Sequence, residues 1–511
     1  MTRNPIKLIA EDFSPVPSLE AYDGVQVSAV EEFGGGTGGA GLDAIGVLVF
    51  DEGPLPEGIG LDRDALARAG FEAKAGQSLL LPQPGHSLII VVGGGPEPEA
   101  TDATLRDAGA AFVRAAKKAT TLGLRVPSIG STDAAAAARA LTEGVLLGRY
   151  RYDALKAEAR EPALERVEFR LDGVDVQAAS AGIAEGVVTA RATAIARDLA
   201  NTPPSHLTAT DMAAAAELLG GRFGFDVEVF DKEQLIELGC GGLLGVNAAS
   251  AEEPRMIVLN FLPEATATGH LGLVGKGIMY DSGGISLKPS DPMHLLMKMD
   301  MGGAAAVLGA FTALRDLGAT ARVTGWLMCT DNMPSGSAYK LGDVLTARGG
   351  KTVEVKNTDA EGRLVMMDGL VLATEEGVDA IVDIATLTGA ALRALGETHS
   401  VVLGTSQPLV DRIVEAGDAT DEATWQFPLM RKYRKLMDSD VADIANLGGT
   451  NAGATTAALF LAEFVGETPW AHLDIAGTMN AESDDSWRSK GATGYGARLL
   501  VEVAKGFTPV E

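Results

Sequence analysis

The sequence predicts an α/β fold of two domains, with a smaller N-terminal α/β domain and a larger C-terminal α/β domain whose mixed sheet is flanked by helices. Short apolar runs rich in Val and Ile alternate with alanine-rich stretches, which is the pattern of α/β layers. At 511 residues the chain is long enough for two or three domains. An alanine-rich segment that ends at two prolines separates the two patterns.

The first pattern occupies residues 1–175. Helices are expected where alanine-rich stretches begin at Thr or Asp and contain few helix breakers. We find no cluster of chemically reactive residues in this part of the sequence. The expected strands are 45–50, 87–92 and 167–171, and the expected helices are 101–123 and 132–150.

One glycine run in this region matches a nucleotide-binding motif by spacing alone. Gly34, Gly36 and Gly39 fit the dinucleotide pattern G-x-G-x-x-G. That motif needs a helix N-terminus facing the pyrophosphate, whereas the next periodic element is IGVLVF, which is typical of a strand. We therefore interpret the run as a loop.

The domain boundary is expected in the alanine-rich, helix-competent segment 178–200. Pro203 and Pro204 follow it, and a proline cannot continue a helix because it lacks the N–H donor. We therefore assign residues 1–175 to the N-terminal domain, 176–203 to a connecting helix and 204–511 to the larger domain.

In the larger domain, apolar strands again alternate with helices. One helix follows Met301 and stops at Gly318, and another presents an apolar face formed by Leu364, Met367 and Val371. The expected strands are 227–230, 256–261, 271–274, 322–329, 378–385 and 471–475.

The chain is strongly acidic, with 42 Lys+Arg against 69 Asp+Glu and a formal net charge of −27. This balance opposes binding to nucleic acid or anionic lipid, since both need Lys and Arg to displace counterions. Cys240 and Cys329 are too few for a disulfide framework or a thiolate metal site, and we expect both to be buried. No stretch approaches the ~18 uninterrupted apolar residues of a membrane span, so we expect a soluble cytoplasmic protein.

Functional groups concentrate in two segments that are expected to follow strands of the larger domain. Open α/β sheets bind ligands at the carboxyl ends of their strands, so these segments form the candidate site. The first segment contains Lys276, Asp281, Lys288 and Asp300, and the second contains Asp359, Glu361 and Arg363.

Four carboxylates brought together without compensation would repel one another strongly. Two divalent cations would cancel the charges of Asp281, Asp300, Asp359 and Glu361. Oxygen ligands suit Mg, Mn or Zn, and Lys276 can join them only if the metal displaces its proton. Because such a pair of ions acidifies a bridging water, the residues indicate metal-assisted hydrolysis.

Lys288 and Arg363 supply further positive charge. A lysine can stabilise an oxyanion, and an arginine fork can hold a small anion or a substrate carboxylate. Structural alternatives stay open, since Lys276 in a glycine-rich loop would be solvated, Asp300 would cap a helix and Asp359 would form a turn.

Other catalytic signatures are missing from the sequence. It contains no H-E-x-x-H, G-x-S-x-G or G-x-x-x-x-G-K-[ST] motif, which disfavours zincins, α/β-hydrolases and P-loop enzymes. The histidines are scattered singly, and we interpret them as structural or surface residues. They are His86, His206, His270, His294, His399 and His472.

The segment NTDAEGRL at 357–364 resembles the signature of the leucyl aminopeptidase family, the cytosolic di-metal aminopeptidases. The segments YDSGGISLKPS, DMGGAAAV, DNMPSGSAYKLGDV, DIATLTGA and WAHLDIAGT are also similar to that family, so the likeness extends from about Asp198 to Leu500. Residues 1–175 match only as a variable α/β domain.

The resemblance implies two divalent metal ions per subunit, Mn or Zn with Mg as an alternative. One ion would be bound by Lys276, Asp281, Asp300 and Glu361. The second, more exchangeable ion would be bound by Asp281, Asp359 and Glu361, so that Asp281 and Glu361 bridge the two.

The resemblance also assigns catalytic and substrate-binding roles. Lys288 would polarise the scissile carbonyl, and Arg363 would hold a bicarbonate ion that acts as general base. The free α-amino group of a peptide substrate would bind one metal with help from Asp300. The side-chain pocket would be lined by Met297, Thr386 and Gly389.

The resemblance implies an exopeptidase that hydrolyses N-terminal, preferably leucine-like, residues from peptides, and it implies a homo-hexamer. The alternative is a bifunctional DNA-binding architectural or regulatory protein on the same fold, which the acidic charge opposes. In one respect the sequence departs from the family: the stretch from Lys288 to Asp300 is one residue longer, which makes Asp291 a rival to Asp300.

Overall fold

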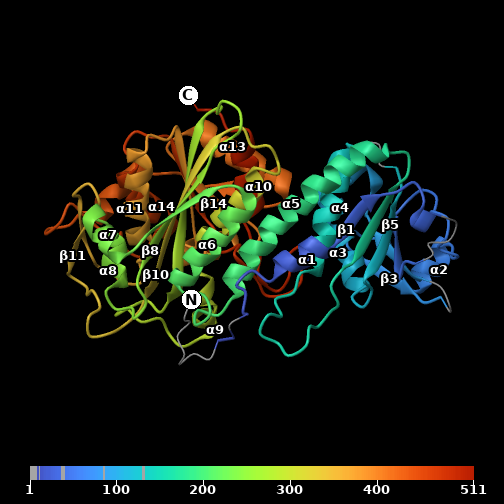
Figure 1. The fold of residues 1–511 in the computed structure, drawn as a ribbon, viewed down its shortest axis with the longest axis horizontal. Coiled ribbons are helices and arrows are strands. Elements are labelled where there is room, and N and C mark those ends of the chain that lie inside the picture. Colours follow the sequence, from blue (N-terminus) through green and yellow to red (C-terminus); the bar gives the residue numbers. More distant parts are fainter. Residues whose placement is uncertain (1–8, 11, 36–40, 84–86, 129–132, 511) are drawn as a thin grey trace. The chain divides into compact units, whose positions relative to one another are not determined.

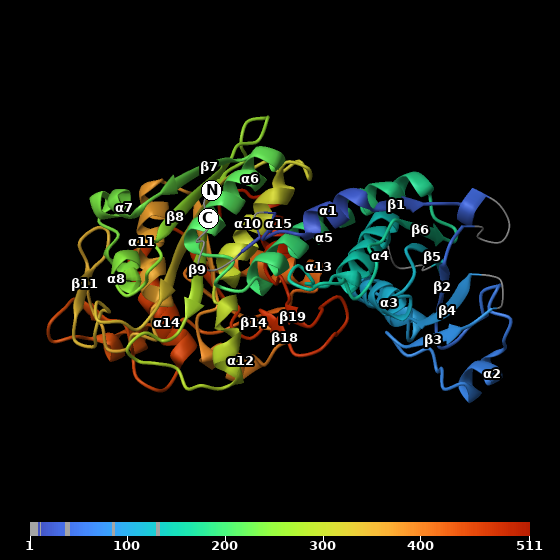
Figure 2. The same cartoon turned by 60° about the horizontal axis from the view of Figure 1, so that its bottom comes forward.

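The computed structural model describes residues 9–10, 12–35, 41–83, 87–128 and 133–510, and it divides into two compact units. The small unit consists of Pro17–Ala194 and Ala481–Lys490. The large unit consists of Ile195–Asn480 and Gly491–Glu511 together with residues up to Val16. Helix α5 (Val176–Asn201) begins in the small unit and ends in the large unit. Figures 1 and 2 show the elements of each unit.

The small unit is built on a six-stranded sheet in the order β1-β6-β5-β2-β4-β3. All neighbouring strands are parallel except β3, which pairs antiparallel with β4. The predicted strands and the second predicted helix lie within two residues of observed elements. The elements are α1 (Ser18–Gly24), β1 (Gln26–Ala29), β2 (Ala44–Val49), α2 (Arg63–Arg68), β3 (Ser78–Leu81), β4 (Leu88–Gly93), α3 (Asp102–Ala115), β5 (Thr121–Val126), α4 (Ala134–Arg149) and β6 (Arg166–Leu171).

The predicted helix 101–123 is wrong at its C-terminal end. Helix α3 ends at Ala115, and the following TLGLRV forms strand β5. The chain turns into this strand because Asp43 accepts hydrogen bonds from the N–H groups of Thr120 and Thr121 at 2.8 and 3.0 Å. Strand β5 then lies parallel to β2 and β6.

The large unit is built on a mixed eight-stranded sheet in the order β15-β14-β17-β13-β9-β10-β8-β7. Helices α6, α10 and α15 cover one face, and α8, α11 and α14 cover the other (Figure 1). All six predicted strands are present, whereas β14 and β15 were not predicted. The strands are β7 (Asp226–Phe230), β8 (Arg255–Phe261), β9 (His270–Asp281), β10 (Arg322–Asn332), β13 (Ala380–Ala385), β14 (Ser400–Gly404), β15 (Thr424–Gln426) and β17 (Trp470–Asp474).

The remaining elements of the large unit connect these strands. The α-helices are α6 (Ala209–Phe223), α7 (Lys232–Leu238), α8 (Gly241–Asn247), α9 (Pro292–Leu295), α10 (Gly302–Leu314), α11 (Gly362–Glu375), α12 (Gly389–Leu395), α13 (Gln407–Thr420), α14 (Gly453–Leu461) and α15 (Ala497–Lys505). Two small sheets are formed by β11 (Val344–Thr346), β12 (Thr352–Glu354) and β16 (Ile444–Ala445), and by β18 (Asn480–Ala481) and β19 (Gly491–Ala492).

Strand β9 is much longer than the predicted strand 271–274, so Lys276 and Asp281 lie on the strand itself. Glycines interrupt the apolar pattern because neighbouring elements approach too closely for side chains. A Cβ on Gly275 would lie 2.7 Å from the Cα of Ala304 in α10, and a Cβ on Gly277 would lie 2.7 Å from the Sγ of Cys329 in β10.

Among the described residues, one stretch, Pro292–Leu314, is long and apolar enough to cross a membrane, and 78% of its most apolar window is buried. Its C-terminal part is helix α10, which packs on the central strands β9, β10 and β13. Burial of this kind is typical of a core helix.

Asp368 joins helix α11 to two neighbouring segments. Its Oδ2 accepts hydrogen bonds from the N–H groups of Gly242 and Leu243 at 2.9 and 3.0 Å, and its Oδ1 accepts one from the N–H of Arg348 at 3.0 Å. The side chain is fully buried. These bonds hold α8 and the segment after β11 against the helix that begins beside Glu361.

Replacing Asp368 by Asn is expected to lower the free energy of unfolding by about 1–3 kcal/mol, because an NH₂ group in place of one oxygen leaves a buried N–H donor unpaired. Urea unfolding followed by circular dichroism measures the change. Asp418→Asn, at an exposed position of α13, is the matched control. A loss below about 0.5 kcal/mol, the usual range for surface changes, would contradict the role of Asp368.

Candidate metal centre

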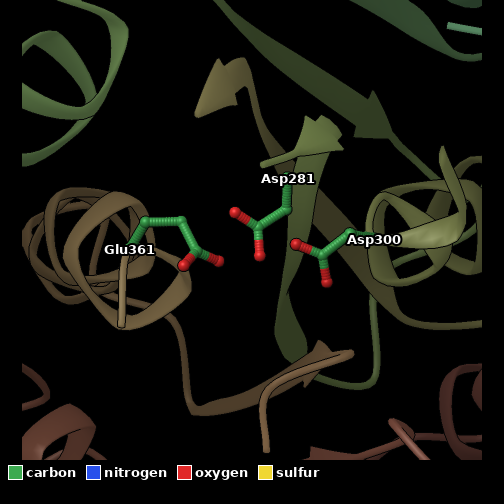
Figure 3. A group of neighbouring side chains, drawn as sticks. All are labelled: Asp281, Asp300 and Glu361. Carbon is green, nitrogen blue, oxygen red and sulfur yellow. The ribbon is translucent and has the colours of Figure 1, made fainter. Parts of the chain in front are cut away.

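Three buried carboxylates from different parts of the large unit point toward one another (Figure 3). Asp281 is the last residue of β9, Asp300 lies just before α10, and Glu361 immediately precedes α11. One oxygen of each lies within 4.8 Å of an oxygen of each of the others. The structure therefore brings together side chains that the sequence separates by up to 80 positions.

Two lysines lie among these carboxylates. The Nζ of Lys276 lies 2.8 Å from each oxygen of Asp300 and 2.9 Å from Oε1 of Glu361. The Nζ of Lys288 lies 2.7 Å from Oδ2 of Asp281 and 2.6 Å from Oδ1 of Asp359. Lys288 thus joins the fourth predicted carboxylate, Asp359, to the cluster.

The pKa values of the acids reflect how little water reaches them. Burial, reinforced by the charge of Glu361, raises the pKa of Asp281 to about 6. Burial likewise raises the pKa of Asp300 and Asp359, against the opposing effect of the nearest lysine. Burial also acts to raise the pKa of Glu361, but the positive charges of the two lysines outweigh it and the pKa falls.

Burial and the neighbouring charges act in opposite directions on the pKa values of the two lysines. Burial acts to lower the pKa of Lys276, yet the charges of Asp300 and Glu361 raise it overall. The same competition raises the pKa of Lys288, with Asp281 as the largest opposing charge. Both ammonium groups are therefore held in the charged form by the carboxylates around them.

The donor set fits divalent cations. Four carboxylates face two ammonium groups, which leaves negative charge in excess in a buried place. In the described part of the chain, Oε2 of Glu361 is buried and accepts no hydrogen bond. Hard oxygen ligands of this kind are those that Mg, Mn and Zn accept, and a lysine can join them once a metal displaces its proton.

The structural roles considered for Asp300 and Asp359, a helix cap and a turn, are filled by other residues. Helix α10 has Met301 at its N-cap, with no side-chain hydrogen bond to the helix end. It is Asp291 that caps a helix, because its Oδ1 accepts a hydrogen bond from the N–H of His294 at 3.0 Å. The turn before α11 is closed by Asn357, whose Oδ1 accepts the N–H of Asp359 at 2.8 Å.

Two residues that sequence reasoning missed support the cluster. The Nδ2 of Asn332 donates to Oδ1 of Asp281 at 2.8 Å and to the carbonyl of Thr358 at 3.0 Å. The hydroxyl of Tyr339 donates to the same carbonyl at 2.8 Å, and burial raises its pKa well above the usual value. Both residues lie in DNMPSGSAYKLGDV, and the similarity of this segment to the family was the signal that could have identified them.

Arg363 lies in the first turn of α11 and is buried. Its Nη1 donates to the carbonyl of Asn446 at 2.8 Å, while its Nε is buried and has no hydrogen-bond acceptor among the described residues. Burial lowers the pKa of Arg363 to about 10, against the charges of Glu361 and Asp474.

A cavity of about 490 Å³ opens beside the cluster. All four carboxylates and both lysines line it, and so do the three predicted pocket residues Met297, Thr386 and Gly389. Thr386 also donates a hydrogen bond to Oδ1 of Asp300 at 2.7 Å. The other lining residues are Met293, Leu387, Thr388, Leu392, Arg393, Ala476 and Met479.

The remaining predictions concern residues away from this cavity. Cys240 and Cys329 are free and buried, as expected. His472 is buried with its Nδ1 2.5 Å from Oδ1 of Asp383, a structural pairing. The glycine run 34–39 and His86 lie partly or wholly outside the described residues, and the next element after the run is strand β2.

Two domains of one known protein family match most of the chain. Residues 194–501 match the catalytic domain of the cytosol aminopeptidase family, and residues 60–159 match the N-terminal domain of the same family. The second match extends the likeness into a region where the motifs alone did not detect it.

Curated relatives and solved structures are similar over comparable lengths. A probable cytosol aminopeptidase of Chlorobium limicola is 42% identical over 468 residues, which cover 87% of this chain and 92% of that protein. One from Chlorobaculum tepidum is 45% identical over 379 residues, covering 72% and 75%.

Two solved structures have the same fold. The bottromycin maturation enzyme BotP in complex with Mn is 38% identical with a TM-score of 0.83, covering 91% of this chain and 99% of that chain. A mutant of tomato leucine aminopeptidase is 32% identical with a TM-score of 0.84, covering 94% and 96%. The chain therefore belongs to the cytosol aminopeptidase family, the leucyl aminopeptidase family that its motifs resemble, whose members are metal-dependent peptidases.

Proposed function

We propose that the protein is a metal-dependent exopeptidase that removes the N-terminal residue, preferably a leucine-like one, from peptides with a free N-terminus. The observation that carries this proposal is the convergence of Asp281, Asp300 and Glu361 at the wall of a cavity of about 490 Å³. Family membership supports the aminopeptidase chemistry.

Two divalent cations, Mn or Zn with Mg as an alternative, are the proposed cofactors. Lys276, Asp281, Asp300 and Glu361 would hold one of them, and Asp281, Asp359 and Glu361 would hold the other. When bound, the cations would polarise the scissile carbonyl and lower the pKa of a water toward ~7. The Mn-bound BotP structure supports the choice of Mn.

Lys288 and Asp300 are proposed to act directly on the substrate. Lys288 lines the cavity, where its Nζ would donate to the oxygen that becomes negatively charged during hydrolysis. Asp300 would orient the free α-amino group of the peptide. An acylated N-terminus carries no such charged group, so cleavage would be confined to free peptide ends.

Arg363 is the proposed holder of a bicarbonate ion that acts as general base. The support is its buried Nε, which has no acceptor in the described structure, together with its position two residues after Glu361. A guanidinium fork binds a planar oxyanion through parallel hydrogen bonds.

A leucine-like preference is supported by the apolar part of the cavity. Met297, Thr386 and Gly389 are the proposed pocket residues, and Met293 and Met479 line the same space. Flexible thioether side chains adapt to branched apolar groups.

The proposal also covers the oligomeric state, the location and the partners of the enzyme. We infer a location in the cytoplasm, in line with the name of the family, and a homo-hexamer, as the resemblance implies. The net charge of −27 opposes the alternative of a DNA-binding protein, since it repels phosphate groups.

Removal of metal ions is expected to abolish hydrolysis of a leucyl chromogenic amide, and added Mn²⁺ or Zn²⁺ is expected to restore it. The rate before and after chelation measures this dependence. The N-acetyl-leucyl amide serves as the control substrate and is expected to remain uncleaved. Equal rates with and without the chelator would refute the metal requirement.

Replacing Glu361 by Ala is expected to lower kcat/KM by more than about 100-fold, because even residues that only orient metal ligands contribute about 10–100-fold. Metal content and circular dichroism are measured on the same samples. Glu375→Ala, an exposed glutamate on the same helix, is the control. A Glu361→Ala variant that keeps its activity and its metal would contradict the ligand assignment.

A further inference from the structure

One cation in the active-site cavity lacks a partner. Arg393, on helix α12, lines the cavity together with the metal-site carboxylates and is exposed. Within the described residues, its guanidinium forms no ion pair and no hydrogen bond. Lys276 and Lys288 in the same cavity each contact two carboxylates. Arg393 therefore carries charge that the protein itself does not neutralise.

The guanidinium lies over the beginning of its own helix. Gly389 and Arg393 are four positions apart and share a helix face. A Cβ on Gly389 would lie 3.2 Å from Nη1 and 3.8 Å from Nη2 of Arg393. The missing side chain at Gly389 thus leaves room for the guanidinium at the part of the wall that belongs to the proposed side-chain pocket.

The cavity that Arg393 lines is apolar in part, beside the metal-site carboxylates, Thr386 and Thr388. Met293, Met297, Leu392 and Met479 line the same cavity and offer no acceptor for an N–H group other than weak thioether sulfur. A ligand that satisfies both features has an apolar stem and a carboxylate at its end. The side chain of glutamate has this chemistry.

Arg393 also lines a second cavity, of about 360 Å³. It is lined by Ala390, Phe427 and residues 450–455 as well as by Arg393. Arg393 therefore borders two cavities, and a peptide that reached from one to the other would also bring its terminal carboxylate near Arg393.

We propose that Arg393 is a specificity-determining residue whose guanidinium binds a carboxylate of the substrate, foremost the side chain of a glutamate or aspartate at the peptide N-terminus. This inference rests on the proposed exopeptidase function and widens its substrate class. Leucine-like residues would use the apolar walls alone, whereas acidic residues would use the walls and Arg393 together.

The test compares glutamyl, glutaminyl and leucyl fluorogenic amides with metal-loaded wild-type enzyme and Arg393→Met. Methionine keeps an unbranched stem and removes the charge. We expect the ratio of kcat/KM for glutamyl over glutaminyl amide to fall by about 10-fold or more, as for loss of a hydrogen bond to a charged group. The change should appear in KM, since the contact is made equally in the bound and reacting substrate. Leucyl turnover should change by less than about 3-fold.

A second pair of substrates distinguishes the two sources of the carboxylate. Leucyl dipeptides are compared as free acids and as C-terminal amides, in wild type and Arg393→Met. A loss confined to the free acids assigns the contact to the peptide terminus, and a loss confined to glutamyl substrates assigns it to the first side chain. Arg68→Met, at an exposed position of α2 in the small unit, is the matched control.

The outcomes separate this inference from the function on which it rests. If the metal-loaded wild type cleaves leucyl amide but Arg393→Met changes neither the glutamyl-to-glutaminyl ratio nor the acid-to-amide ratio, the role of Arg393 is refuted and the exopeptidase function stands. If the metal-loaded wild type cleaves no amide or dipeptide, both are refuted.

Discussion

The close contact between strand β9 and helix α10 is the constraint on which the site depends. A Cβ on Gly275 would lie 2.7 Å from the Cα of Ala304, and a Cβ on Gly303 would lie 3.0 Å from the backbone nitrogen of Lys276. Only glycine permits this approach without displacing backbone. Because the helix lies so near the strand, Lys276 in the middle of β9 and Asp300 just before α10 reach one another at 2.8 Å.

This geometry accounts for the electrostatic character of the cluster. Carboxylates from β9, from the segment before α10 and from the start of α11 meet at the carboxyl end of β9, with the two lysines between them. Burial and the charge of Glu361 raise the pKa of Asp281 to about 6, above the ordinary value of about 3.9 for an aspartate. A site with excess acid in a buried place is suited to bind dications, since their charge replaces the missing solvation.

The cationic side chains that line the cavity differ in whether a carboxylate pairs with them. Lys276 and Lys288 are bound to carboxylates and belong to the cluster, whereas Arg393 lies against Gly389 and has no acidic partner among the described residues. Charge that is already neutralised contributes little to the binding of an anionic substrate. The charge of Arg393, which no carboxylate in the described part of the chain neutralises, stays available to an anionic substrate.

The sequence alone determined the fold class, the motif-bearing residues and the family, because these follow from short local patterns: alternation of strands and helices, and eight consecutive residues at 357–364. Only the tertiary structure decided how those residues meet. Strand β9 was underestimated because its glycines serve contacts with other elements, and Asn332 and Tyr339 were missed because their partners lie in distant segments. The return of Ala481–Lys490 to the small unit is likewise invisible in sequence. Packing between distant segments produces no periodic pattern in the sequence. The position of a side chain such as Arg393 is therefore known only from the folded structure.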